Sequence, residues 1–376
     1  MIDYRNVYSI YKAVHFPEKI EKLRRGELIV PTHVQVDLTG RCNYNCHVCF
    51  YRNAGFKHLE FVPNEELKVD RALRLMEEFG EIGIPAIELT GGGEPLMYPA
   101  IKEVLKIIAK NKMELALVTN GSLLTEEILS HIENPAWIRF SIDAATPKTY
   151  AWYHQVPEEM FYKVLENLQR VIDAKFKNCI IGVSYVISPR NYDEVFAAAL
   201  LFKEMGVDNI RYSFAYTAKY DKLLTPEQRK EAFRQIELAE KLQDSKFRVF
   251  AMKKRLDDFG KPNTDFTYCG YQRFTFQIGC DGRCYPCCIL KYYPKYSFGN
   301  IYEKPLKEIL FGEERKKYLE NFDVTKCLPC WLRHRNKVIE GLVFNKIKEM
   351  LSPEEYEEFL RYSKLPKEKC LHVNFV

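Results

Sequence analysis

The sequence has no long apolar run and no recognisable targeting segment. Its 376 residues contain no stretch near the roughly 18 uninterrupted apolar residues that a membrane span needs. The first residues, from Met1 to Asn6, lack the basic-then-apolar order of a signal peptide. These two absences predict a cytoplasmic protein without a membrane partner.

The sequence also lacks a strong charge of one sign. Its formal net charge is +5, from 56 Lys and Arg against 51 Asp and Glu, which does not require a nucleic-acid partner. Apolar residues make up 47% and charged residues 28%, as in ordinary globular proteins. The length suits one large domain with a smaller one attached, or two medium domains.

The pattern of a disulfide scaffold is missing in spite of twelve cysteines. Dense disulfides belong to small secreted domains. Here ten of the twelve gather in two groups of a long chain, within residues 42–49 and 269–330. Metal ligation explains this grouping better than cross-linking does.

What the sequence does contain is an alternation of short β-rich runs and longer helical patterns. The strand candidates are residues 33–39, 86–90, 115–119, 137–142, 180–187 and 209–216. The helical candidates between and after them are residues 64–79, 100–110, 158–174, 192–205 and 226–242. Crossovers of this length predict an α/β fold, with a parallel sheet wrapped into a partial (β/α)6 TIM-like barrel.

The pattern changes after the barrel. A hairpin turned at Asp281-Gly282 is expected from strands at 274–278 and 285–290, with a short helix at 305–311. We therefore expect five segments, which are an N-terminal helical extension (1–32), the barrel (33–245), a linker (246–268), a small α+β domain (269–335) and a helical tail (336–376).

Three cysteines in the spacing C-x3-C-x2-C follow directly on the first strand. They are Cys42, Cys46 and Cys49, and no further cysteine occurs before Cys179. Three thiolates can hold a cubane iron–sulfur cluster by three irons and leave the fourth iron open. An open position implies chemistry at the metal, so this loop predicts an enzyme. The alternative is a zinc site with His47 as fourth ligand, although zinc sites usually build from C-x2-C pairs.

Polar or glycine-rich residues end all four of the first strands. Besides the cysteines, residues 91–95 end the second strand, Asn120 follows the third, and Ser141 and Asp143 end the fourth. Barrels of this kind place their active sites at the C-terminal ends of the strands. The four loops therefore predict one site.

These motifs resemble the radical S-adenosylmethionine (SAM) enzymes. The resemblance implies that Cys42, Cys46 and Cys49 ligate a [4Fe–4S] cluster whose open iron binds the amino and carboxylate groups of SAM. Reductive cleavage of SAM then gives a 5′-deoxyadenosyl radical, which takes a hydrogen atom from the substrate.

The resemblance also implies cofactor-binding residues. Gly92, Gly93 and Glu94 match the glycine-glycine-glutamate motif that contacts the cofactor amine. Glycines let the backbone come close, and the carboxylate pairs with an ammonium. Asn120 and Ser141 are candidates for the ribose and the carboxylate. Many relatives carry an arginine about twenty residues after the serine, where this chain has Tyr162-Lys163, so the group that holds the carboxylate stays open.

The second cysteine group resembles the auxiliary-cluster extension called SPASM, in its shortened single-cluster form known as twitch. The resemblance implies that Cys269, Cys287, Cys327 and Cys330 fully ligate a second [4Fe–4S] cluster. Four thiolates close that cluster, so its implied role is electron transfer.

Three further cysteines lie near the hairpin, namely Cys280, Cys284 and Cys288. The period of the expected strand puts Cys284 and Cys288 on one face and Cys287 on the other. Cys288 stands where SPASM sulfatase-maturing enzymes have a proton-accepting aspartate. A thiol is a poor base but a good hydrogen-atom donor, so Cys288 is our candidate catalytic residue. The alternatives are a buried small side chain, or replacement of Cys287 as ligand by one of these three.

Three other stretches leave two interpretations each. Residues 152–154 either line a substrate pocket or anchor a loop. In residues 211–213 only alternate side chains can face the barrel interior, and the sequence does not say which. The basic stretch 331–337 is expected to be a solvated helix face.

Together these features predict a radical SAM oxidoreductase. It removes a hydrogen atom from a small molecule or peptide, and the auxiliary cluster assists the electron transfer of a net oxidation. The alternatives are an epimerase that uses Cys288, or an RNA-modifying enzyme whose binding depends steeply on salt. About 32 residues precede the first strand, too few for a leader-peptide domain. We expect an external one-electron reductant of the flavodoxin or ferredoxin type and no nucleic-acid partner.

Overall fold

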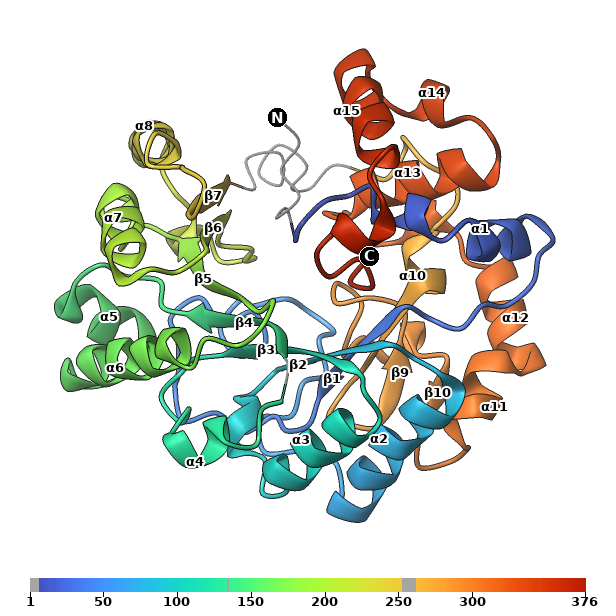
Figure 1. Ribbon diagram of the computed structural model, residues 1–376, viewed down its shortest axis with the longest axis horizontal. Coiled ribbons are helices and arrows are strands. Elements are labelled where there is room, and N and C mark those ends of the chain that lie inside the picture. Colours follow the sequence, from blue (N-terminus) through green and yellow to red (C-terminus); the bar gives the residue numbers. More distant parts are fainter. Residues whose placement is uncertain (1–6, 134, 252–261) are drawn as a thin grey trace.

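One curved sheet organises the molecule. The computed structural model describes residues 7–133, 135–251 and 262–376. In this part of the chain ten strands join in the order β10-β9-β8-β1-β2-β3-β4-β5-β6-β7. The strands from β8 through β1 to β7 are parallel, and β9 and β10 continue the sheet antiparallel. Figure 1 shows the parallel strands curving as an open barrel with helices on the outside.

The first six strands confirm the α/β barrel expected from the sequence, each within two residues of its expected bounds. They are β1 (His33–Asp37), β2 (Ala86–Thr90), β3 (Glu114–Thr119), β4 (Pro135–Ser141), β5 (Ile180–Ile187) and β6 (Asn209–Phe214). These strands are buried almost throughout, as in β5, where one residue of eight is partly exposed. Helices on one face and the barrel interior on the other make such burial normal for a parallel sheet.

Helices cover the outer face of the barrel. Along the chain they are α2 (Val69–Ile82), α3 (Ile101–Lys110), α4 (Glu126–Leu129), α5 (Pro147–His154), α6 (Glu159–Asp173), α7 (Val195–Met205) and α8 (Pro226–Glu240). Helix α2 begins five residues later than expected. The preceding residues instead pair with the end of β1, through a bridge from Thr39 to Glu66 and a hydrogen bond from Leu67 N–H to Leu38 O of 2.9 Å.

The segment expected to be a linker contributes a further strand. Strand β7 (Arg248–Ala251) adds to β6 in parallel register, so the barrel gains a seventh consecutive strand. Only four residues long, β7 carries too short a pattern to be recognised in the sequence. The remainder of the glycine- and proline-containing stretch, residues 252–261, lies outside the described residues.

The hairpin of the small domain is built onto the barrel itself. Strand β8 (Thr275–Ile278) pairs in parallel with β1, turns at Asp281-Gly282, and continues to β9 (Arg283–Tyr285) and β10 (Gly299–Asn300). The second hairpin strand was expected at 285–290, and this is wrong, because β9 ends at Tyr285. The inference that Cys284 and Cys288 share a strand face falls with it.

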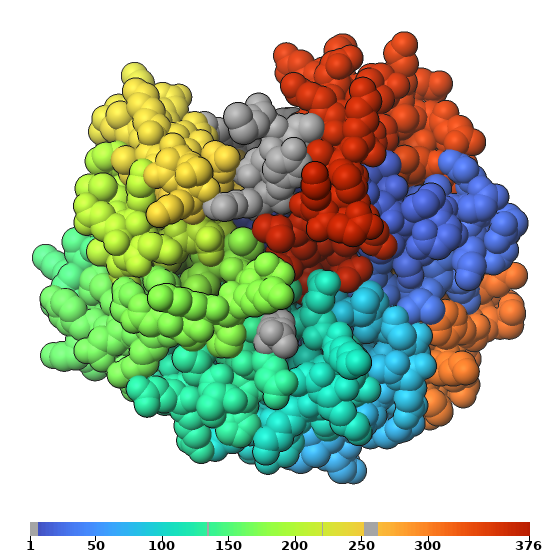
Figure 2. Space-filling view, viewed as in Figure 1, coloured from blue at the N-terminus to red at the C-terminus, as the bar shows by residue number. Residues whose placement is uncertain are grey.

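Helical segments from both chain ends close one side of the barrel. Among the described residues the remaining α-helices are α1 (Pro17–Arg24), α10 (Tyr271–Phe274), α11 (Leu306–Phe311), α12 (Glu313–Glu320), α13 (Arg333–Val343), α14 (Ile347–Met350) and α15 (Pro353–Ser363). Tyr11 and Phe16 pack in one apolar cluster with Val338 and Phe359. Figure 2 shows the red C-terminal segment lying over the middle of this face, beside the blue N-terminal segment.

This closed side lies at the N-terminal ends of the strands. Phe375 packs with Trp137 and Ile180, which lie near the beginnings of β4 and β5. Asn374 donates a hydrogen bond of 3.0 Å to the Glu114 carboxylate at the start of β3. No described helix is long and apolar enough to cross a membrane.

A buried ion pair joins the small domain to the barrel. Lys291 Nζ lies 2.7 Å from Asp37 Oδ1 at the end of β1, and both side chains are 1% exposed or less. Asp37 Oδ2 also accepts hydrogen bonds from Tyr292 Oη at 2.7 Å and from Gly92 N–H at 2.9 Å. Burial opposes the charge of Lys291, but the carboxylate of Asp37 outweighs it and raises the pKa of Lys291 above its usual value.

Lys291→Met leaves the Asp37 carboxylate buried without its cation, so we expect the free energy of unfolding to fall by about 3–5 kcal/mol. The measurement is thermal unfolding of the anaerobically reconstituted protein. The matched control is Lys304→Met, which removes exposed ion pairs to Glu308 and Glu314 and should change the melting temperature little. Equal melting temperatures for the two variants would show that the Asp37–Lys291 pair does not hold the domains together.

Candidate functional site

The loop that carries the cysteine triplet is fixed by backbone contacts on both sides. Cys49 N–H donates to Cys46 O at 3.1 Å, and His47 N–H donates to Tyr153 O, in α5, at 2.8 Å. The guanidinium of Arg52 donates to Gly40 O at 2.7 Å, which closes the base of the loop. The His47 ring packs against Trp152, with centroids 4.5 Å apart.

The glycine-rich loop after β2 packs directly against the cysteine loop. Glu94 N–H donates a hydrogen bond of 2.8 Å to Arg41 O. A Cβ atom at Gly93 would lie 2.1 Å from the same oxygen, so only glycine allows this approach. Gly93 therefore allows the two loops to approach closely, so that the Glu94 carboxylate and the three thiols line the same cavity.

The Glu94 side chain is held rigidly at the ends of β2 and β3. Its Oε1 accepts hydrogen bonds from Thr119 Oγ1 at 2.7 Å and Leu96 N–H at 3.1 Å, and its Oε2 accepts one from Asn120 N–H at 2.8 Å. Burial raises the pKa of Glu94 to about 7 in spite of these donors. A buried carboxylate of this kind is stabilised by a cation, which an incoming ammonium group supplies.

A cavity of about 440 Å³, the cofactor cavity, opens at the C-terminal ends of the strands. All eight residues predicted for the first cluster and for SAM line it, namely Cys42, Cys46, Cys49, Gly92, Gly93, Glu94, Asn120 and Ser141. The Asn120 amide also donates to Asn43 Oδ1 at 2.9 Å, which ties the third loop to the cysteine loop. Loops from four strands therefore meet in one place.

Asp143 and His154, which the sequence places at and after the end of the fourth strand, also line the cofactor cavity. His154, at the end of α5, places Nδ1 3.1 Å from Cys46 Sγ and Nε2 3.2 Å from Ile142 O. Asp143 Oδ1 accepts a hydrogen bond of 2.5 Å from Val186 N–H. Burial raises the pKa of Asp143 to about 7. Of residues 152–154, Tyr153 and His154 line the cavity, so this stretch contributes to the pocket from a helix.

The structure resolves which residues of β6 face inward. Arg211 and Ser213 line the cofactor cavity. Tyr212 points the other way, where its hydroxyl donates a hydrogen bond of 2.6 Å to Val195 O at the start of α7. This is the period of two of a β-strand.

The four cysteines predicted for the auxiliary cluster line one small, largely apolar cavity. Cys269, Cys287, Cys327 and Cys330 meet there among side chains such as Ile289 and Phe266. Burial raises the pKa of Cys327 to about 12, and the neighbouring Cys269 adds to the rise. Four converging thiols that lose protons only reluctantly fit a site where a positively charged metal group takes the place of those protons.

None of the three extra cysteines lines this cavity, although Cys288 packs against the same apolar cluster. Cys280 Sγ is 3.3 Å from Tyr292 Oη, beside Asp37. Cys284 is buried in the main apolar core of the barrel. Cys288 faces the barrel interior, although it follows directly on Cys287.

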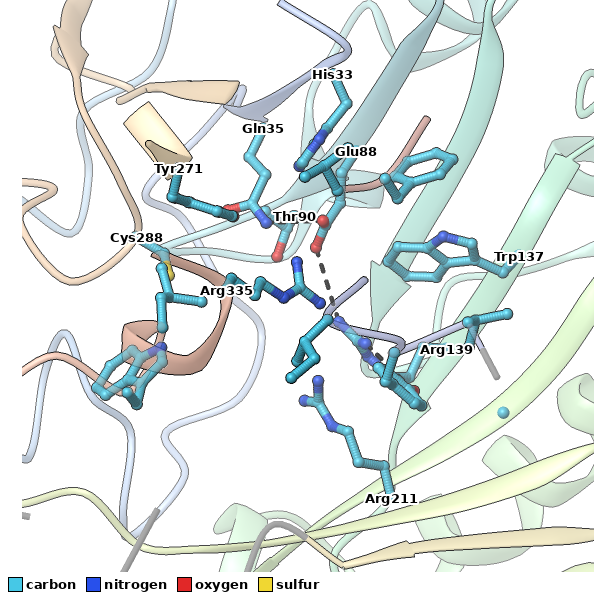
Figure 3. Close-up of a pocket in the computed structure, with 18 of the residues that line it drawn as sticks. His33, Gln35, Glu88, Thr90, Trp137, Arg139, Arg211, Tyr271, Cys288 and Arg335 are labelled. Atoms are coloured by element: carbon cyan, nitrogen blue, oxygen red, sulfur yellow. Dashed lines mark hydrogen bonds and ion pairs between the residues drawn. The ribbon is translucent and has the colours of Figure 1, made fainter. Parts of the chain in front are cut away.

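A second, larger cavity of about 690 Å³, the barrel cavity, lies inside the barrel toward the N-terminal ends of the strands. Figure 3 shows side chains from β1, β2, β4 and β6 pointing into it. The basic stretch 331–337 does not form the solvated helix face expected for it. Trp331, Leu332, His334 and Arg335 line this cavity, and Arg333 and Asn336 are buried.

The two cavities meet in the middle of the barrel. Five residues line both of them, namely Tyr51, Thr90, Arg211, Cys288 and Trp331. They come from the cysteine loop, from β2 and β6, and from the small domain. A molecule in the barrel cavity can therefore contact one in the cofactor cavity without leaving the protein.

Two family models match this chain. Residues 36–202 match the Radical SAM superfamily, and residues 269–331 match SPASM, an iron–sulfur cluster-binding domain. The first match covers the end of β1 and all of β2 to β5, and the second contains the four cysteines of the small cavity.

Curated relatives are similar at modest identity. The AdoMet-dependent heme synthase of Methanosarcina barkeri is 28% identical over 332 residues, which is 83% of this chain and 90% of that protein. The GTP 3′,8-cyclase of Clostridium perfringens is 30% identical over 179 residues, 47% of this chain and only 53% of that protein.

Solved structures share the fold. Streptococcus suis SuiB superimposes with a TM-score of 0.61 at 15% identity, covering 84% of this chain and 75% of SuiB. The protein anSMEcpe with bound AdoMet superimposes with a TM-score of 0.58 at 15% identity, covering 92% of this chain and 99% of anSMEcpe.

An open barrel with three thiols beside a glycine-held carboxylate, joined to a four-thiol domain, defines an iron–sulfur enzyme. The two family models identify residues 36–202 as a radical SAM domain and residues 269–331 as a SPASM iron–sulfur cluster-binding domain. These domains imply a SAM-binding [4Fe–4S] cluster, an auxiliary cluster and SAM itself. The zinc alternative for the triplet, with His47 as fourth ligand, is therefore set aside.

If the cysteines divide as predicted, replacing each group removes one cluster only. The triple Ala variant of Cys42, Cys46 and Cys49 should bind about four irons instead of about eight per chain. The quadruple Ala variant of the four-cysteine cavity should also bind about four. The measurement is iron and sulfide content after anaerobic reconstitution, with Cys284→Ala as the control that keeps both clusters. Loss of a cluster in that control would overturn the assignment.

Glu94→Gln should weaken SAM binding by about 10- to 100-fold, because a charge-assisted hydrogen bond contributes about 1.5–3 kcal/mol. Equilibrium dialysis of the reconstituted, unreduced enzyme with SAM measures this. Glu103→Gln, on the exposed side of α3, is the matched control with wild-type affinity. Unchanged affinity in Glu94→Gln would remove the glutamate from the cofactor site.

Proposed function

We propose that this enzyme oxidises a small-molecule or peptide substrate that occupies the barrel cavity while SAM occupies the cofactor cavity. A cluster held by Cys42, Cys46 and Cys49 would, once reduced, provide the electron for the reductive cleavage of SAM bound in the same cavity. The observation that most supports the proposal is that five residues line both the barrel cavity and the cofactor cavity. Where the two cavities meet, a C–H bond of the substrate can approach the adenosyl group of SAM.

The chain's own residues have defined tasks in this proposal. The three thiols of Cys42, Cys46 and Cys49, which line the cofactor cavity, would hold the first cluster. Glu94 fixes the amino group of SAM from its rigid position between β2 and β3. Asn120 and Ser141 line the same cavity and contact the remainder of the cofactor.

Electron transfer to the second domain is supported by residues that are neighbours in the chain. Cys287 lines the four-cysteine cavity, and the next residue, Cys288, lines both larger cavities. In the same way Cys330 lines the four-cysteine cavity and Trp331 lines both larger ones. Cys269, Cys287, Cys327 and Cys330 would hold an auxiliary cluster there, which would provide an acceptor for the substrate electron and so make the reaction a net oxidation. An external one-electron reductant of the flavodoxin or ferredoxin type completes the cycle.

A tetrapyrrole is the first substrate class to test. The relative named AdoMet-dependent heme synthase matches this chain along 90% of its own length. The GTP cyclase match spans about half of its relative and supports a nucleotide substrate less.

The epimerase alternative also has a specific observation in its favour. The Cys288 side chain lies where the two cavities meet, as a hydrogen-atom donor must. The RNA-modifying alternative loses its support, because the basic stretch 331–337 turns toward the barrel cavity.

The reaction outcome separates oxidation from epimerisation. Under strong reductant the enzyme should form 5′-deoxyadenosine, and the triple Ala variant of the cysteine triplet should form none. In deuterium oxide with the tetrapyrrole substrate, an oxidised product without solvent deuterium is expected, in the Cys288→Ala variant as well. Mass spectrometry of product and 5′-deoxyadenosine measures both.

Two results would contradict the proposal. Absence of 5′-deoxyadenosine from the wild-type enzyme would remove the radical reaction altogether. Solvent deuterium in an unoxidised product, lost in Cys288→Ala, would replace oxidation with epimerisation.

A further inference from the structure

A buried lysine lies behind the cysteine loop and has no task in the proposed function. Lys222 ends a short 3₁₀-helix, Tyr220–Lys222, in the connection between β6 and α8. It is only 6% exposed. Lysine is almost never buried to this degree unless its ammonium group meets a partner, so the surroundings of Lys222 need an explanation.

The connection that carries Lys222 packs against the cysteine loop. The Thr217 hydroxyl donates a hydrogen bond of 3.0 Å to Ala54 O. Ala218 N–H donates a second one, of 2.8 Å, to the same oxygen. Because these bonds join the two segments a few residues before Lys222, its side chain is directed at the residues that surround the cysteine triplet.

The partners of Lys222 are backbone oxygens of the cysteine loop. Its Nζ donates hydrogen bonds to His47 O and, at 3.1 Å, to Asn53 O. Asn53 itself donates to Cys46 O at 2.7 Å from its amide and to Cys49 O at 2.8 Å from its N–H. Lys222 and Asn53 therefore hold the turn between two of the three cysteines through its carbonyl groups.

The charge of Lys222 is not met by a carboxylate in direct contact. Among the described residues no acidic oxygen lies within 4.0 Å of its Nζ. Burial, followed by the neighbouring Lys219, lowers the pKa of Lys222. The exposed Asp221 and the thiol of Cys49 act in the opposite direction. The Cys49 sulfur is thus within electrostatic reach of a buried ammonium group.

We propose that Lys222 is a positioning residue whose ammonium makes a cluster held by Cys42, Cys46 and Cys49 easier to reduce. The inference rests on the proposed function in one respect, namely that this triplet holds the first cluster. Reduction transfers one electron from the external reductant and so adds one negative charge beside the ammonium. A fixed cation stabilises that charge, since buried charges are screened less than exposed ones. Net charge and hydrogen bonding around a cluster contribute to its reduction potential.

A redox titration of the reconstituted enzyme, followed by electron paramagnetic resonance without SAM or substrate, tests this inference. In Lys222→Gln and Lys222→Met the midpoint potential of the first cluster should become more negative. At the wild-type midpoint the ratio of reduced to oxidised cluster should fall by about 10-fold. Lys222→Arg keeps the positive charge, so its midpoint should lie closer to the wild-type value than those of the neutral variants.

Two controls and one matched variant separate the effect of charge from that of structure. The cluster signal that persists in the triple Ala variant of Cys42, Cys46 and Cys49 should keep its midpoint in the Lys222 variants. Lys230→Met, which removes an exposed lysine of α8, should leave both midpoints unchanged. The amide of Lys222→Gln can still donate hydrogen bonds to backbone carbonyls, so this variant removes the charge and keeps a donor. Iron content shows whether each variant retains both clusters.

Equal midpoints of the first cluster in the wild type and the neutral variants would overturn the inference, as would an equal shift in Lys222→Arg and Lys222→Gln. Loss of the first cluster from both neutral variants would also overturn it, because Lys222 would then have a structural role only. The titration contains no substrate, so its result does not depend on the proposed oxidation. An enzyme with the expected shift that forms no oxidised product would refute the proposed reaction and leave the role of Lys222 intact.

Discussion

Strand β1 is the constraint on which the remainder of the structure depends. It pairs with β2 on one side and with β8 on the other, so a single strand belongs both to the barrel and to the sheet of the small domain. Asp37, at its end, receives Lys291 and Tyr292 from the small domain and Gly92 from the second loop. The cysteine loop begins directly after this point. Both cysteine groups are therefore connected to the same strand, although they lie far apart in the sequence.

The barrel interior follows from this arrangement. Strand pairing on both sides of β1 leaves the barrel open between β7 and β8, and segments from the two chain ends cover its N-terminal side. The interior consists of the cofactor cavity and the barrel cavity, and the five residues that line both lie at their boundary. Glu94 is buried in the cofactor cavity, and the barrel cavity is lined by Arg139 and Arg335 together with Glu88. Cys288 and Trp331 lie at this boundary, and the residues directly before them, Cys287 and Cys330, line the four-cysteine cavity.

Local sequence patterns predicted the parts of this structure that depend on local physics. The β/α alternation located six strands, and the ends of those strands located the cofactor site, because parallel strands must bring their C-terminal ends to one edge. The cysteine spacings distinguished two groups. Local patterns do not encode the pairing of distant segments, such as that of β8 with β1. They also do not reveal a strand as short as β7. The same limit hid the polar lining of the barrel cavity. Arg335 lies in a basic stretch, which is usually solvated, and only tertiary packing turns it inward. The alternation of Trp137, Arg139 and Ser141 along β4 was a usable signal that these three residues share the interior face.

One measurement tests the central claim. According to this claim, the cysteine triplet holds a cluster with one iron free for SAM, and the four-cysteine cavity holds a cluster whose irons are all bound by cysteines. Electron paramagnetic resonance spectra of the fully reduced enzyme are recorded with and without SAM. The structure predicts two cluster signals, of which only the one lost in the triple Ala variant of Cys42, Cys46 and Cys49 changes when SAM is added. A SAM-dependent change in the signal of the four-cysteine cavity, or no change in either signal, would contradict it.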